Sequence, residues 1–111
     1  MCEFKILIQE PGKKEYQATE DISYLSLQDN GTIILTGFGV KETIDAALIT
    51  EVNVYADEGA KLRLLKIPML KDFVQFLKMI ETGSYNPEIE TSWNSFVKKG
   101  NALIKELKEN K

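Results

Sequence analysis

The stretch that decides the fold is residues 22–36, ISYLSLQDNGTIILT, in which two apolar, β-branched runs flank Asp29-Asn30-Gly31. Asn-Gly is the strongest short-range signal for a β-hairpin, because both residues tolerate a positive φ at the centre of the turn. We therefore predict strands over residues 22–27 and 32–36 that pair with each other.

The chain before this hairpin has the alternation of a half-buried strand. Over residues 2–9, the side chains of Cys2, Phe4, Ile6 and Ile8 fall on one face, and more polar residues fall on the other. Pro11-Gly12 then predicts a turn. Further strands are expected after the hairpin, at residues 40–44, 48–55 and 61–65.

Five or six short strands, joined by tight turns, thus occupy the first 66 of the 111 residues. We expect them to form a small SH3-like or Sm-like β-barrel of antiparallel strands over residues 1–66. A closed barrel has no exposed sheet edges, which a sheet this small has little material to cover.

The apolar period changes from two to helical spacing after Pro68. One helix is expected to end near Gly83, and Asn86-Pro87 supplies an N-cap and a first-turn proline for a second. The short loop between them predicts an αα-hairpin over residues 67–111. Gly100, within the apolar stripe of the second helix, is expected to permit the close approach of another element. The predicted class is α+β, mainly β with an α-helical extension.

Charge and composition argue against several functions. The chain carries 14 Lys+Arg against 17 Asp+Glu, and residues 1–66 alone hold 7 basic against 11 acidic residues, which argues against RNA binding. No apolar run is long enough to span a membrane. A single cysteine cannot form an intramolecular disulfide, which fits a reducing compartment, so we expect a cytoplasmic protein.

The chain contains no histidine, which removes the commonest general base and the usual catalytic triads and zinc ligand sets. The carboxylate pairs Glu20-Asp21 and Asp57-Glu58 are expected in turns, where acids are solvated. Gly37-Phe38-Gly39 is expected to be a turn rather than part of a nucleotide-binding loop. Trp93 and Phe96, at helical spacing, are expected to be packing residues, with an interface to another subunit or protein as the alternative. We therefore expect a protein that is not an enzyme.

Cys2 is the one candidate site residue, and its pattern leaves two interpretations open. It can continue the inward face of Phe4 as a small apolar residue. It can also bind a metal, through its thiolate and neighbouring backbone nitrogens or, after removal of Met1, through its thiolate and amine, in an arrangement suited to Ni(II) or Cu(II). One thiol does not complete a site, so the metal interpretation requires a homodimer that shares the ion.

Met1-Cys2-Glu3-Phe4 at the head of a strand, Glu20-Asp21-Ile22, the Asp29-Asn30-Gly31 turn and the strands over residues 32–35 and 49–54 resemble the CooT-like proteins. These are small prokaryotic proteins that begin with Met-Cys. Their founding member is a nickel-binding accessory protein of carbon monoxide dehydrogenase maturation, and members are also catalogued as predicted RNA-binding proteins.

The resemblance covers about residues 1–66, and the helical extension is not typical of the family. It implies that Cys2 of each subunit of a homodimer is a nickel ligand. Delivery of the ion to an enzyme does not follow from the resemblance, and a metalloenzyme client is a candidate partner only. The expected function is a small, non-enzymatic nickel-binding accessory protein. The alternatives are an RNA-binding module, for which no site residues are predicted, and a protein-interaction module without a metal role.

Overall fold

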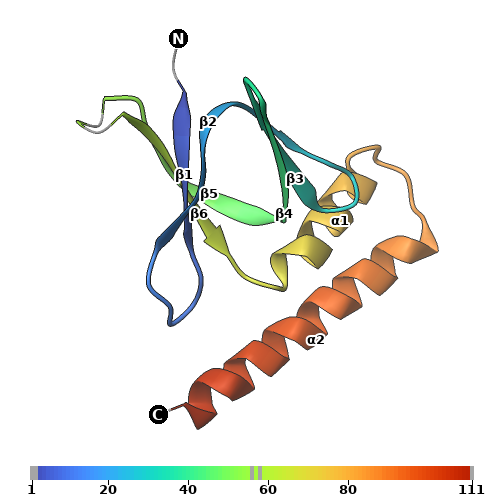
Figure 1. Cartoon of the computed structure of the whole chain (residues 1–111). Helices are drawn as coiled ribbons and strands as arrows, with labels where there is room; N and C mark the ends of the chain where they lie inside the picture. Colours follow the sequence, from blue (N-terminus) through green and yellow to red (C-terminus); the bar gives the residue numbers. More distant parts are fainter. Residues whose placement is uncertain (1–2, 56, 58, 111) are drawn as a thin grey trace.

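Six strands followed by two helices make up the protein (Figure 1). The computed structural model describes residues 3–55, 57 and 59–110. The class is α+β, mainly β, as predicted. The elements are β1 (Phe4–Gln9), β2 (Tyr16–Leu27), β3 (Thr32–Gly37), β4 (Val40–Asp45), β5 (Ala47–Asn53), β6 (Ala60–Lys66), α1 (Leu70–Ile80) and α2 (Pro87–Glu109).

The strands form one mixed sheet with the order β4-β3-β2-β1-β6-β5. The predicted all-antiparallel barrel is wrong on two counts. β6 pairs with β1 in parallel, and β4 and β5 are the two ends of the sheet rather than neighbours that close it. Only Ala46 separates these two end strands in the sequence, so they meet at one corner and then diverge. The sheet is strongly curled but open, and β5 is left as an edge strand.

A bend in β2 produces the curl. Its first half pairs with β1 and its second half with β3, and Ile22 is where the two pairings meet. Asp21 has a φ of 61°, the one positive value among described non-glycine residues. At this bend the backbones of β2 and β3 touch, because a Cβ on Gly37 would lie 1.7 Å from the Asp21 carbonyl oxygen. The strand is thus longer than the predicted residues 22–27, and it joins two halves of the sheet.

The core lies inside the curl, between these two halves. The alternation predicted for the first strand is confirmed for Ile6 and Ile8, which are buried and point to the same side. Burial of such aliphatic side chains provides most of the stabilisation of a small domain, at about 25 cal/mol for each Å² of apolar surface. The fully assembled cluster comprises Ile6, Ile8, Ile22, Ile33, Leu35, Leu62 and Leu64.

The predicted hairpin forms between β2 and β3, but its turn differs from the expected type. Gly31 alone has a positive φ, 83°, and the loop is closed by a hydrogen bond from Gln28 N to Thr32 O at 2.8 Å. Asn30 stabilises the turn through its side chain. Its Oδ1 accepts one hydrogen bond from the Thr32 backbone N at 3.0 Å and another from the Thr32 hydroxyl at 2.7 Å. The Asn-Gly pair therefore marked the turn correctly, with glycine supplying the left-handed residue.

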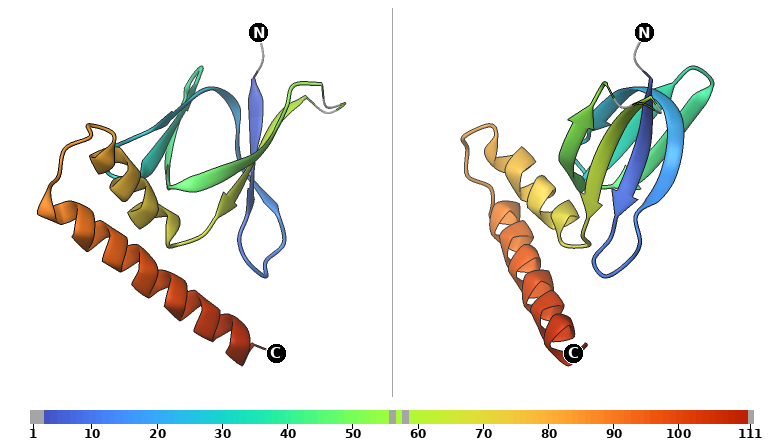
Figure 2. Two further views of the ribbon diagram at one scale, coloured as in Figure 1. Left: turned by 180° about the vertical axis from the view of Figure 1, so that it is seen from behind. Right: turned by 90° about the vertical axis from the view of Figure 1, so that its left-hand side faces the viewer.

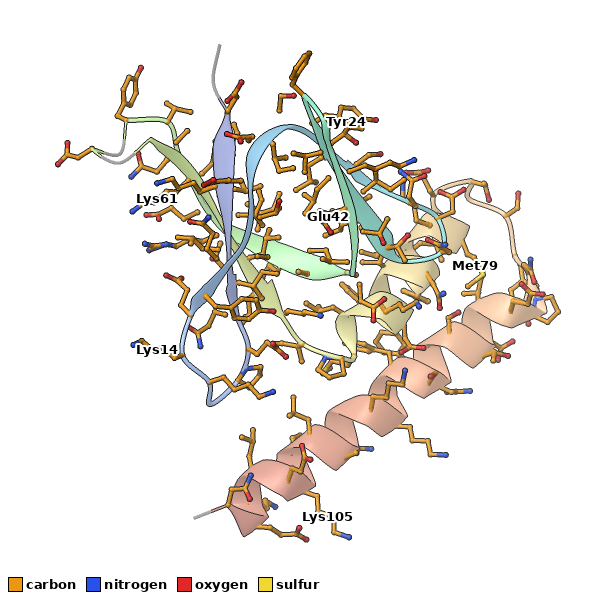
Figure 3. All side chains as sticks on the ribbon, in the orientation of Figure 1. Lys14, Tyr24, Glu42, Lys61, Met79 and Lys105 are labelled. Atoms are coloured by element: carbon orange, nitrogen blue, oxygen red, sulfur yellow. The ribbon has the colours of Figure 1, made fainter. Side chains whose placement is uncertain are left out.

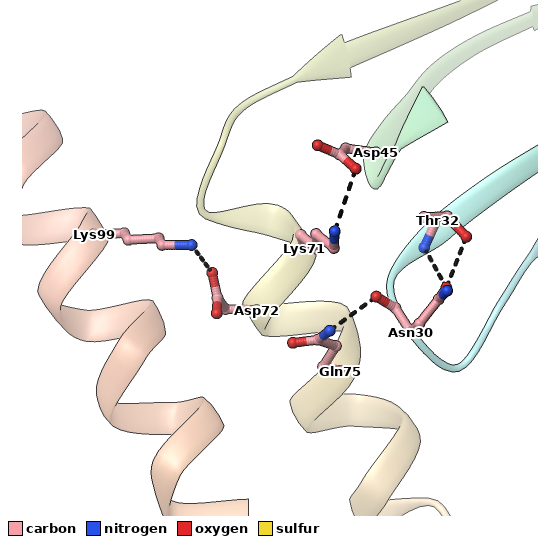
Figure 4. Close-up of polar contacts among 7 residues, drawn as sticks. All are labelled: Asn30, Thr32, Asp45, Lys71, Asp72, Gln75 and Lys99. Atoms are coloured by element: carbon pink, nitrogen blue, oxygen red, sulfur yellow. Dashed lines mark hydrogen bonds and ion pairs between the residues drawn. The ribbon is translucent and has the colours of Figure 1, made fainter. Parts of the chain in front are cut away.

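Helix α1 packs on this hairpin turn (Figure 4). Gln75 Nε2 donates to the Asn30 carbonyl at 2.9 Å, and Lys71 Nζ lies 3.5 Å from an Asp45 carboxylate oxygen. A Cβ on Gly31 would lie 2.8 Å from the Lys71 carbonyl oxygen, so the glycine also allows the helix to approach. The turn that defines the sheet thus also fixes the position of the first helix.

Helix α2 begins as predicted, with the Asn86 side chain accepting from Glu88 N at 2.9 Å and Pro87 in the first helical position. It packs against α1, which lies between α2 and the sheet (Figure 2). None of its side chains is fully buried. Neither helix in the described part of the chain combines the length and the apolar character needed to cross a bilayer.

Candidate functional site

The start of β1 is the part of the structure nearest in sequence to the predicted nickel ligand. Cys2 itself lies outside the described residues. Glu3 is exposed, and Phe4 pairs with Ile22 on one side and with Ala60 on the other. The strand that follows Cys2 is therefore a central strand, and it begins at the end of the sheet where β2 bends and β6 starts.

The two strands that flank β1 have carboxylates nearby in the sequence: Glu20 and Asp21 within β2, and Asp57 just before β6. The prediction that Glu20 and Asp21 lie in a turn is wrong, because both belong to β2 at its bend. Asp57 lies in the turn before β6, and Glu58 is outside the described residues. Among residues 3–55, 57 and 59–110, no three histidine, cysteine, aspartate or glutamate side chains are grouped so that they could hold a metal ion.

The outer face of β6 carries a cation between two carboxylates. Arg63 Nε lies 3.3 Å from Glu51 Oε1 of β5 and 3.6 Å from Glu15 Oε2, which precedes β2. All three side chains are partly exposed, so the pairs contribute little to stability. Their charges offset one another, and a guanidinium held in this way is less available to a phosphate than one on a continuous basic stripe.

An aromatic cluster joins the two helices, and the prediction that Trp93 and Phe96 are packing residues is confirmed. The ring centroids of Phe96 and Phe73 are 4.9 Å apart, and those of Trp93 and Phe76 are 5.1 Å apart. Such pairs contribute about 0.5–1.5 kcal/mol beyond the area they bury. The turn predicted at Gly37-Phe38-Gly39 is also confirmed, with Gly39 at a φ of 75°.

A polar contact extends the helix pair beyond the aromatic cluster. Asp72 of α1 accepts from Lys99 Nζ at 2.6 Å (Figure 4). It also accepts from Ser95 Oγ at 2.9 Å. Burial alone would raise the pKa of Asp72, but the hydrogen bonds from Lys99 and Ser95, together with the lysine charge, outweigh burial and lower it. Directly after Lys99, a Cβ on Gly100 would lie 3.2 Å from Met69 Cε, so this glycine does permit a close approach.

Replacing Asp72 by asparagine should lower the free energy of unfolding by about 1–2 kcal/mol at neutral pH, because a charge-assisted bond between the helices is lost. The pKa of Asp72 in the folded protein lies below its ordinary value of 3.8. The extra free energy of unfolding that aspartate gives over asparagine is therefore complete above pH 3.8, and it is lost as the pH falls through the pKa of the folded protein. Urea unfolding of both proteins from pH 7 to pH 2 measures this difference.

Asp29→Asn is the matched control, because Asp29 is paired with Lys78 at 3.8 Å but is 93% exposed. It should cost no more than about 0.5 kcal/mol at any pH. Equal losses for the two variants would contradict a special role for the Asp72 contact.

Two surfaces that the sequence did not single out are candidates for binding. The first is a groove of about 370 Å³ between residues 67–69, which precede α1, and the C-terminal half of α2. The second is the exposed apolar surface of edge strand β5. The apolar period in the sequence indicated that both segments have an apolar face, but it gave no sign that those faces are uncovered. The groove is lined by Ile67, Pro68, Met69, Lys99, Ala102, Leu103 and Glu106.

Comparison of the chain with protein-family models, with curated proteins and with solved structures gave no match.

Proposed function

We propose that this chain is a small, non-enzymatic nickel-binding accessory protein of the cytoplasm, in which Cys2 of two copies shares one ion at a homodimer interface. The observation that carries the proposal is the Met1-Cys2 start directly before the first strand, which the chain has in common with CooT-like proteins. A metalloenzyme that receives the ion is the corresponding partner.

The chemistry of the residues around Cys2 agrees with such a site. A thiolate is a soft ligand, and together with deprotonated backbone nitrogens it offers the planar set that Ni(II) accepts. The exposed Glu3 is the next residue along the chain. Because one chain has one thiol, a second copy supplies the second sulfur, and a two-fold axis passes through the ion.

Replacing Cys2 by serine should weaken Ni(II) binding at least about 100-fold, because loss of a ligand costs no less than loss of its outer-shell partners. Calorimetry gives the affinity, and native mass spectrometry should show one nickel ion for every two chains of the parent protein. The sulfur-to-nickel charge-transfer absorption should disappear with the thiol.

Glu3→Gln is the matched control, since it changes the adjacent residue and leaves the thiol in place. It should retain nickel binding within a few fold, because the thiolate remains. Unchanged affinity in Cys2→Ser, with the native far-UV circular dichroism spectrum, would refute the proposed site.

A second candidate function is protein–protein interaction through the helical extension. The observation that favours it is that α2, 23 residues long, has no buried side chain and exposes four large apolar ones. Exposed apolar stripes of this kind are typical of helices that pack on a partner. This function needs no metal, and the RNA-binding alternative has no comparable observation in its favour.

A further inference from the structure

Helix α2 exposes a row of apolar side chains beside the face that packs on α1. Ser95, Phe96 and Lys99 contact α1 directly. The row next to them consists of Trp93, Val97, Ile104 and Leu107, whose side chains are 40–57% exposed. Trp93 also contacts Phe76 of α1, yet it remains 43% exposed. An exposed apolar row of this kind is typical of a helix that binds a partner.

The spacing of this row is that of a coiled-coil seam. From residue 90 to residue 107, its positions are separated by alternating steps of three and four residues. Such alternation keeps one continuous line of side chains facing a neighbouring helix. We define the α2 seam as Glu90, Trp93, Val97, Gly100, Ile104 and Leu107. The partner that fits this seam is therefore another helix.

The charges along α2 select the direction of that second helix. Residues 87–96 contain two glutamates and no basic residue, whereas residues 97–109 contain four lysines and two glutamates. Lys99 is neutralised by Asp72, which still leaves three lysines against two glutamates in the second half. A copy of α2 that runs parallel would bring like charges together at each end, at an energetic cost. An antiparallel copy places the acidic start of each helix beside the basic end of the other.

The charged groups that an antiparallel pair would use are accessible. Glu90 accepts a hydrogen bond from the Tyr85 hydroxyl, which is neutral, so the carboxylate keeps its charge. Lys105 and Lys108 form no ion pair with another residue in the described part of the chain. Figure 3 shows Lys105 projecting from the side of α2 that is turned away from the sheet. A second helix can therefore reach these groups without breaking an ion pair of the first.

The seam also matches itself when it is reversed. In an antiparallel pair with a two-fold axis between residues 98 and 99, each seam residue of one copy faces a different seam residue of the other. Trp93 then faces Ile104, which pairs two large apolar side chains. Val97 faces Gly100, where α2 has no side chain to obstruct the approach. The middle of the seam therefore suits a close contact between two identical helices.

The two ends of the seam fit each other in the same register. Leu107 of one copy lies over Glu90 of the other, with Lys108 beside that carboxylate. A groove of about 300 Å³ is present at this point. It is lined by Phe76, Ile89, Glu90, Trp93 and Asn94. The contact between Trp93 and Phe76 thus forms a wall of a groove that an aliphatic side chain can enter, and Leu107 is the residue that the register brings to it.

We propose that a second copy of this chain binds here, with the two α2 helices antiparallel about a two-fold axis and Leu107 of each copy seated in the groove of the other. This inference rests on the protein-interaction function proposed above and does not depend on nickel. The seam covers residues 90–107, about 26 Å of helix. A contact of this length is small for a specific interface, so we expect a dimer with a dissociation constant in the micromolar range.

Disulfide formation between engineered cysteines tests the direction and register of the two helices. In the Cys2→Ser background, which has no other thiol, Glu90→Cys and Leu107→Cys are mixed at equal concentration and oxidised by air. Mixed dimers should exceed the dimers formed by either variant alone at least about tenfold, because a disulfide requires Cα atoms within about 7 Å and only the mixed pair brings its cysteines face to face. The other end of each mixed dimer keeps its native Leu107 and Glu90. Intact mass distinguishes the products.

Thr91→Cys is the matched control for Glu90→Cys, because it moves the thiol by one residue, about 100° around the helix and off the seam. Its mixture with Leu107→Cys should give no excess of mixed dimers. Disulfide dimers from each seam variant alone would indicate parallel helices. That result, or an equal yield of mixed dimers with the control, would overturn the proposal.

Charge reversal at the ends of the seam tests the contribution of Lys108 to the affinity. Sedimentation equilibrium of the Cys2→Ser parent should show a dimer, and Lys108→Glu should raise its dissociation constant at least about tenfold, because a glutamate then lies beside Glu90 at both ends. Glu90→Lys/Lys108→Glu in one chain restores opposite charges and should return the constant to within about threefold of the parent. Lys98→Glu is the matched control, with the same charge change off the seam, and it should stay within about threefold of the parent.

Leu107→Asp should give a monomer with a native circular dichroism spectrum, since Leu107 is 57% exposed in the single chain. No recovery in the double reversal, or an equal loss for Lys98→Glu, would overturn the proposal. A monomeric parent that binds a different helical protein through Leu107 would overturn the second copy as occupant and leave the protein-interaction function standing. Nickel binding is measured separately on the chain that retains Cys2, so failure of this dimer and failure of the Cys2 site are distinguishable.

Discussion

Alanine at Gly37 is expected to abolish the native fold. The added Cβ would lie 1.7 Å from the Asp21 carbonyl oxygen and 2.8 Å from the carbonyl carbon, which are backbone atoms at the bend of β2. Relief of this overlap requires β2 and β3 to separate where the two halves of the sheet are joined. We expect a loss of more than about 4 kcal/mol, a large part of the total stability of a small domain. Urea unfolding monitored by circular dichroism measures it.

Gly39→Ala distinguishes this overlap from a general cost of replacing glycine. Gly39 has a φ of 75°, but nothing lies within 4 Å of a Cβ at that position. Alanine there should cost only about 1–2 kcal/mol, the strain of a left-handed residue. Comparable losses for the two alanine variants would show that the β2 and β3 backbones are not in contact at Asp21.

Leu35→Ala should be the most damaging of the simple core truncations. Leu35 is 0% exposed and belongs to the cluster that includes Ile6, Ile33 and Leu64. Its removal takes away apolar burial and leaves a cavity between the two halves of the sheet, for an expected loss of about 3–5 kcal/mol. The same urea unfolding experiment gives this value.

Leu48→Ala is the matched control for Leu35→Ala, because the same side-chain atoms are removed from a residue that is 56% exposed. It should cost less than about 1 kcal/mol, because the side chain buries little apolar surface. A loss for Leu35→Ala no greater than that for Leu48→Ala would contradict the position of the core.

One part of the candidate site could be identified from the local sequence, and the other part depends on contacts between distant segments of the chain. Cys2 was a candidate from the sequence alone, because it is the one thiol and it precedes a strand. The groove beside α2 and the exposed apolar residues of β5 became candidates only from the tertiary structure. Their residues follow ordinary strand and helix periodicity, and periodicity identifies an apolar face without identifying what covers it.

The sequence by itself determined most of the local structure. Alternation placed Ile6 and Ile8 on the buried face of β1, Asp29-Asn30-Gly31 located the hairpin, and Asn86-Pro87 located the start of α2. Each of these features depends on residues within a few positions of one another, through turn chemistry, capping or a repeating face. Short-range interactions of this kind are encoded in short stretches of sequence.

Only the tertiary structure decided how the strands are arranged. β1 pairs with β6 in parallel across more than fifty residues, and β4 and β5 separate instead of closing a barrel. Strands of similar composition have several possible partners, and the choice depends on the packing of Leu62 and Leu64 against Ile6 and on the bend at Asp21. These are contacts between distant parts of the chain, so the exposed edge at β5 follows from the whole fold and from no local pattern.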